Sequence, residues 1–183
     1  MNREELIFSY DRGERNFAKV NLSQQNLENV NLDDINLTRA NLTEANLTNA
    51  RIERGRLLQI NLELANLTQA YLNGSNLADA NLSKALLYKV CLLEANLQRA
   101  NLSQVILQSG FLREADLSYA NLKNADLTGA NLTNADLTGT NLTNVNFNNA
   151  YMVGACLKDA CIENTSWENT IVTGLTMPNG SVI

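Results

Sequence analysis

An apolar residue returns at every fifth position of the chain, from Phe17 to Met177, without a break in register. It is leucine in most units, and the position two before it is usually a small residue, most often alanine. The position directly before it is usually asparagine, as in ANLTEANLTNA (40–50). A repeat of fixed length determines the architecture of a chain, so this period is the first feature to explain.

A period of five fits neither a helix nor a straight strand. In an α-helix, a step of five residues turns the side chain by about 140°, which would scatter the leucines around the cylinder. In a strand, side chains alternate between two faces, so an odd step would send successive leucines to opposite sides.

A short extended segment followed by a bend satisfies the pattern. The small residue and the leucine are two apart, so they point the same way, and a quarter turn in the next two residues keeps every unit facing one interior. Four units then close a coil of about twenty residues, and stacked coils pair at about 4.8 Å. The pattern predicts a rod of about eight four-sided coils, about 40 Å long, filled by leucine and alanine.

This A-N/D-L-x-x pattern resembles the pentapeptide repeat family. The resemblance implies an all-β fold, a right-handed quadrilateral β-helix solenoid with a short N-terminal helical cap and a C-terminal capping segment. We therefore expect one domain over residues 1–183, with an N-terminal cap at 1–15, repeats at 16–174 and a C-terminal cap at 175–183. The repeat body with a helical N-terminus looks most like bacterial, cytoplasmic members of the family.

The N-terminal residues 3–11 (REELIFSYD) have the composition of a helix, with acidic residues in the first turn and Gly13 as its stop. Leu6, Ile7 and Tyr10 would share one face of this helix. Because an open stack of coils exposes unpaired edges, we expect that face to cover the first coil.

The C-terminal end departs from the repeat. Trp167 occupies a core position that other coils give to leucine, which suggests that it plugs the bore. The tail at 175–183 contains the only proline and an Asn179-Gly180 turn pair. We expect this tail to form the second cap.

Composition limits the chemistry available. The chain has no histidine and a net charge of −5, which argues against a zinc site, against a histidine-dependent catalytic triad and against DNA binding. We expect no metal, no cofactor and no small-molecule substrate. An odd number of cysteines, no membrane-length apolar run and an N-terminus without a secretory apolar segment favour the cytoplasm.

Folding the chain at twenty residues per coil aligns outward positions into columns. One column loses its asparagine in most coils; it reads Asn31, Arg51, Tyr71, Cys91, Phe111, Asn131, Tyr151, Ile171. Neighbouring positions add further apolar residues. The predicted surface, called the mid-rod patch below, consists of Arg51, Tyr71, Leu86, Tyr88, Cys91, Leu93, Ile106 and Phe111, with Arg51 placed to stack on Tyr71.

Exposed apolar clusters on soluble proteins usually mark contact with another molecule. The mid-rod patch therefore predicts an unknown protein partner or self-association, and a small-ligand site is a weaker interpretation. The competing interpretation is local decay of the repeat, because outward positions are not constrained by packing.

Three classes of function are open. The first is a non-enzymatic interaction scaffold, which a rigid solenoid suits because function resides in residues on its faces. The second is a DNA-mimic inhibitor of a type II topoisomerase, which the quinolone-resistance branch of the resembled family implies. Such a mimic needs dense negative charge, whereas here the outward position is mostly asparagine and only the C-terminal third is acidic. The third, an enzyme, would need a pocket that a filled narrow tube does not provide.

Overall fold

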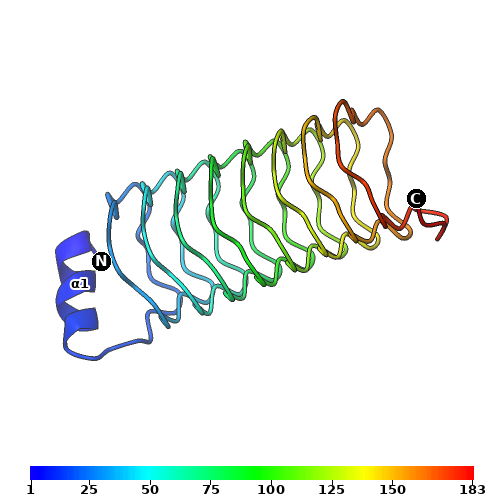
Figure 1. The fold of residues 1–183 in the computed structure, drawn as a ribbon. Helices are drawn as coiled ribbons and strands as arrows, with labels where there is room; N and C mark the ends of the chain where they lie inside the picture. Colours follow the sequence, from blue (N-terminus) through cyan, green and yellow to red (C-terminus); the bar gives the residue numbers. More distant parts are fainter.

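The computed structural model describes residues 1–183 as a straight rod that begins with one helix, α1 (Arg3–Asp11), and continues as stacked coils (Figure 1). Parallel bridges join residues twenty apart, such as Asn21 with Asn41 and Asn41 with Asn61, so four pentapeptides complete each coil. The prediction of a solenoid is confirmed. None of the helical structure has the length and apolar character needed to cross a membrane.

The pairing takes the form of isolated bridges rather than continuous strands, because each pentapeptide turns before a second pair can form. The leucine N–H donates to the next coil, as from Leu62 to the Asn81 carbonyl at 2.7 Å. The small residue closes the turn within its own coil, as from the Ala65 N–H to the Leu62 carbonyl at 3.0 Å. The second residue after each inward leucine of the five-residue period adopts a left-handed backbone conformation, with φ of +59° at Leu64.

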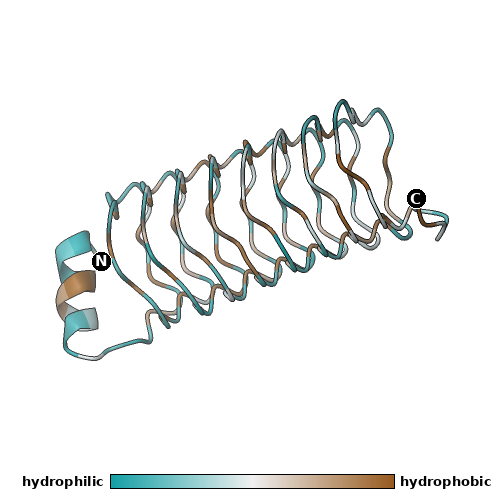
Figure 2. Cartoon of the chain, viewed as in Figure 1, coloured by the Kyte–Doolittle hydropathy of each residue, from teal (hydrophilic) through white to brown (hydrophobic).

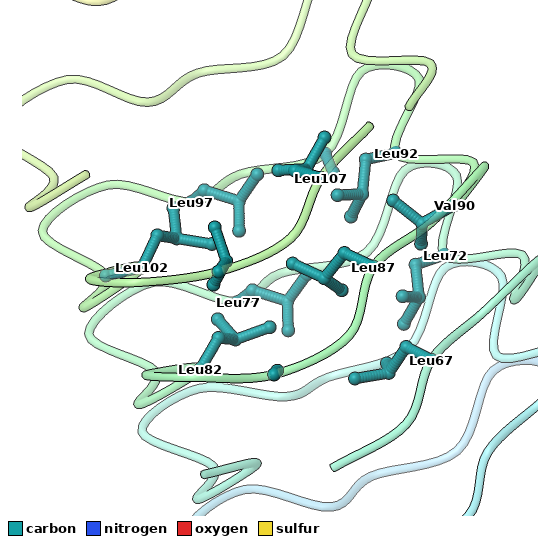
Figure 3. Close-up of a cluster of buried hydrophobic side chains, with 14 of the residues drawn as sticks. Leu67, Leu72, Leu77, Leu82, Leu87, Val90, Leu92, Leu97, Leu102 and Leu107 are labelled. Atoms are coloured by element: carbon teal, nitrogen blue, oxygen red, sulfur yellow. The ribbon is translucent and has the colours of Figure 1, made fainter. Parts of the chain in front are cut away.

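The leucines and small residues face inward, as predicted. They form one hydrophobic cluster of 54 buried residues that runs the length of the rod. Figure 3 shows leucines of successive coils, such as Leu77 with Leu97 and Leu82 with Leu102, directed into the shared interior. In Figure 2 the hydropathy alternates along each coil, because the chain passes repeatedly between inward and outward positions.

Helix α1 lies across the start of the rod (Figure 1). Asn2 and Glu5 form a capping box: the Glu5 N–H donates to Asn2 Oδ1 at 2.8 Å, and the Asn2 N–H donates to the Glu5 carboxylate at 3.0 Å. Leu6 is fully buried, and Ile7 and Tyr10 pack against the core. The predicted shared face of the helix is therefore the face that contacts the coils.

The C-terminal end is less covered than the N-terminal end. Trp167 stacks on Phe147 with ring centroids 4.8 Å apart but stays partly exposed beside an apolar hollow of about 270 Å³. The coil conformation continues to Thr176, which bridges Cys156, so the expected boundary at 174/175 falls within a coil. The tail then turns back, and Thr176 pairs antiparallel with Val182. The role of both ends as caps stays a prediction.

Candidate functional site

The outward column predicted from the twenty-residue period exists in the structure. Arg51 bridges Tyr71, Tyr71 bridges Cys91, and Cys91 bridges Phe111, so these residues lie on successive coils of one face. The column continues through Asn131. Because each bridge sets neighbouring coils about 4.8 Å apart, the side chains form a continuous row along the rod axis.

The structure brings all the residues of the mid-rod patch onto two adjoining faces. Leu86 and Ile106 bridge each other on the face next to the column that contains Tyr71, Cys91 and Phe111, called the Tyr71 column below. Tyr88 follows Leu86 around the coil toward Cys91, and Leu93 lies on the other side of Cys91. The six large apolar side chains are between 37% and 45% exposed: Tyr71, Leu86, Tyr88, Leu93, Ile106, Phe111.

Cys91 lies at the floor of a shallow hollow of about 240 Å³. Its walls are Tyr71 and Phe111 from the coils on either side, and Asn49, Gln69 and Lys89 from the adjoining corner. Burial, and to a lesser extent the negative charge of Glu53, raises the pKa of the Cys91 thiol above its usual value. The thiol is therefore neutral near pH 7, which suits packing against a ligand rather than nucleophilic attack.

The charged residues around the patch differ in how they are neutralised. The Arg51 guanidinium lies 3.2 Å from both Asp33 and Glu53, and it sits 5.7 Å from the centre of the Tyr71 ring, as predicted. The hydrogen bond to Asp33 raises the pKa of Arg51 further above its usual range. Lys89 makes no ion pair, and its ammonium lies 5.1 Å from the centre of the Tyr88 ring. Lys89 is thus the uncompensated cation at the hollow.

Sequence reasoning missed a set of backbone donors beside the column. Where the outward residue is asparagine, its side chain accepts the N–H two residues on, as Asn131 Oδ1 does from Thr133 at 3.0 Å. Tyr71, Phe111 and Tyr151 cannot accept that bond. As a result, the N–H groups of Asn73, Arg113 and Val153 have no acceptor within the chain. The loss of asparagine in the column was the signal that could have revealed them.

Asp126 follows Leu86 and Ile106 in the neighbouring column. Burial alone would raise the pKa of its carboxyl, but hydrogen bonds from Thr128 and Gln108 outweigh it and hold the pKa below the usual value of 3.8. The ionised carboxylate therefore stabilises the folded chain at neutral pH, and this contribution is lost as the pH falls through the lowered pKa.

We expect Asp126→Asn to remove this acid dependence. Near pH 6 the wild type should unfold at a higher urea concentration than Asp126→Asn. This difference in urea midpoint should shrink as the pH falls below about 3.8. Parallel urea titrations of both proteins from pH 6 to pH 2 would measure it. A difference that stays constant over this range would show that Asp126 has the same pKa folded and unfolded.

The rest of the surface offers no comparable arrangement. No cluster of three or more cysteine, aspartate or glutamate side chains is placed to hold a metal ion. The other hollows lie at the two ends of the rod, and two of these three are mainly polar. The mid-rod patch is therefore the candidate site, and its exposed apolar side chains suit contact with another macromolecule.

The repeats match those of a known protein family. A family model described as pentapeptide repeats matches in eight copies, over residues 16–54, 60–97, 95–134 and 130–166. No curated protein matches the sequence.

Solved structures similar to the chain include the following three, and the last of them supports the fold. HetL, a pentapeptide repeat protein involved in heterocyst differentiation regulation from Nostoc sp. strain PCC 7120, is 28% identical with full coverage of both chains and a TM-score of 0.33. Rfr23 from Cyanothece 51142 is 27% identical, covering 92% of this chain and 98% of that one, with a TM-score of 0.38. The plasmid-mediated fluoroquinolone resistance protein QnrB1, in a trypsin-treated variant, is 12% identical, covering 88% and 81%, with a TM-score of 0.56.

Proposed function

Because the chain belongs to the pentapeptide repeat family, we propose that it is a non-enzymatic scaffold that binds a partner protein through the mid-rod patch. One observation carries the proposal: six large apolar side chains are exposed together on two adjoining faces near the middle of the rod. Soluble monomers rarely leave such clusters uncovered, since burying them in an interface is favourable. We place the protein in the cytoplasm, which fits its three free thiols.

The inhibition of a type II topoisomerase by DNA mimicry is the less favoured candidate. The acidic column of Asp116 and Asp136 is short and gives way to Cys156 on the next coil. Near the N-terminal end, Arg54 pairs with Asp34 through two hydrogen bonds of 2.9 Å, which neutralises the charge there. We expect the protein not to inhibit DNA supercoiling by gyrase at micromolar concentration. Clear inhibition would contradict the scaffold proposal and favour the DNA-mimic function in its place.

The double variant Tyr71→Asn/Phe111→Asn tests the patch. It restores the repeat residue at both positions, so the fold should persist while partner binding or self-association falls at least about tenfold. Sedimentation velocity of the purified chain and pull-downs from the native host would measure the two readouts.

Tyr119→Asn provides the matched control. Tyr119 is 65% exposed but lies away from the mid-rod patch, so the change removes an exposed aromatic side chain without touching the site. Its backbone φ of +59° suits asparagine. If the double variant and the control behave alike, the mid-rod patch is a decayed repeat and not a binding surface.

A further inference from the structure

From Tyr71 to Tyr151 the column alternates between large and small residues. Tyr71, Phe111 and Tyr151 are 40%, 45% and 49% exposed, whereas Cys91 and Asn131 between them are partly buried. Consecutive bridges from Tyr71 to Tyr151 keep these five residues on one face. Aromatic rings therefore stand two coils apart, at about 9.6 Å. The smaller side chains of Cys91 and Asn131 lie between them, and each step between two rings is called a notch below; the notch over Cys91 is the hollow described above.

The unpaired backbone donors follow the same spacing. The N–H groups of Asn73, Arg113 and Val153 lie two residues after the three rings, and none has an acceptor within the chain. At the notch positions the equivalent donors are occupied: the Leu93 N–H donates to Asn73 Oδ1 at 3.0 Å, and the Thr133 N–H donates to Asn131 Oδ1. Between Tyr71 and Tyr151 the face thus presents one ring and one free N–H every two coils.

Among regular backbone conformations, polyproline II matches this spacing best. It repeats every three residues, or about 9.3 Å, and leaves all its carbonyl groups free to accept hydrogen bonds. An α-helix returns to the same face after seven residues, or about 10.5 Å, and its carbonyls are already bonded internally. A strand repeats on one face at about 6.8 Å, which is out of step with the rings.

We propose that this column binds a proline-rich segment of a partner protein in the polyproline II conformation. The proposal rests on the proposed function, in that this face is the one that binds a partner. Proline rings three residues apart pack into the notches over Cys91 and Asn131, between the aromatic rings. Carbonyl groups of the segment accept the N–H bonds of Asn73 and Arg113. Aromatic grooves suit such segments because little conformational entropy is lost on binding.

Two observations define the partner further. This chain contains a single proline, Pro178, so a second copy cannot supply the segment. Lys89 lines the hollow over Cys91 and makes no ion pair, whereas Arg51 is neutralised by Asp33 and Glu53. The segment should therefore carry an acidic residue next to the proline that enters the Cys91 notch.

The test uses the full chain and a fluorescently labelled synthetic peptide that has two prolines three residues apart and a glutamate before the first. Fluorescence anisotropy measures the dissociation constant. We expect binding, and we expect replacement of both prolines by alanine to weaken it at least about tenfold. This comparison needs no variant of the protein.

Filling the notches separates this proposal from the proposed function. Cys91→Phe and Asn131→Phe each add apolar surface to the face but occupy a notch, so each should weaken peptide binding at least about tenfold. Lys89→Glu should weaken binding of the glutamate peptide and should favour a matched peptide with lysine in its place. Circular dichroism of each variant verifies the coil fold.

Three results would overturn the polyproline proposal: no binding of the proline peptide, unchanged binding by both notch-filling variants, or tighter binding of a helical peptide with leucines seven residues apart. The scaffold proposal would survive them if Tyr71→Asn/Phe111→Asn still lost its partner. If that double variant loses the proline peptide but keeps its partner in the pull-down and its state of association, the scaffold proposal fails as stated and the polyproline proposal stands.

Discussion

Replacing Ala100 by aspartate should prevent folding or lower the free energy of unfolding by more than about 4 kcal/mol. Ala100 is fully buried in the bore, between Leu97 and Leu102 along the chain. Its own N–H is bonded to the Leu97 carbonyl at 3.0 Å, and the surrounding side chains are aliphatic. A carboxylate placed there would lose its hydration and find no donor, which is among the most costly changes a core can undergo.

The control lies one residue further on. Asn101 points outward, and Asp116 shows that an aspartate fits the equivalent site, where it accepts the N–H and the hydroxyl of Ser118. Asn101→Asp gives up only the amide bond to Asn81, so it should cost about 1 kcal/mol or less. Urea titrations followed by circular dichroism would compare the two variants. Equal losses would contradict the assignment of inward and outward positions.

That assignment could be predicted from the sequence, because the period of five is incompatible with the two common alternatives. Once each unit must bend, the leucine and the small residue can only share one interior, and the column of Arg51, Tyr71, Cys91 and Phe111 follows from counting twenty residues per coil. The helix at Arg3–Asp11 was predictable for a different reason, since its first turn carries the acidic residues and its apolar face is narrow.

The turn conformations and the path of the C-terminal tail could not be predicted from the sequence, because they depend on contacts made in the folded chain. Local preference identifies glycine as the residue for a left-handed turn, yet Leu64 and Tyr119 adopt φ of +59° there because stacking of the coils imposes the bend on whatever residue occupies it. The path of the tail after Thr176 depends on a single antiparallel bridge to Val182, which no periodicity encodes.

The candidate site was predictable in its residues but not in its chemistry. The loss of asparagine from the column is visible in the sequence, whereas the free N–H groups of Asn73, Arg113 and Val153 become evident only when the asparagine side chains elsewhere are seen to occupy equivalent donors. Tyr151 can be recognised as part of the same row only because it is followed, like Tyr71 and Phe111, by an unpaired N–H group. Sequence reasoning grouped residues by apolar character and therefore ended the patch at Phe111.

Replacing Leu102 by alanine should lower the free energy of unfolding by about 3 kcal/mol. This value lies within the range measured when a fully buried leucine is truncated to alanine in a rigid core. Leu102 is fully buried, and the bridges of Asn101 to Asn81 and Asn121 align it with the leucines of both adjoining coils. Since interiors are closely packed and the coil backbone is fixed by its bonds to neighbours, the bore cannot collapse around the lost atoms.

Leu64→Ala is the matched control, because Leu64 is 47% exposed at a corner of the rod and the same atoms are removed. Its effect should stay within about 0.5 kcal/mol. The position of Leu102 near the middle of a solenoid adds a second expected result. Each coil contacts only its neighbours, so weakening one coil weakens its contact with both, and the two halves of the rod should unfold less cooperatively. Urea titrations should therefore give Leu102→Ala a lower midpoint and a shallower slope, and a lower midpoint with an unchanged slope would show that the rod still unfolds as one unit.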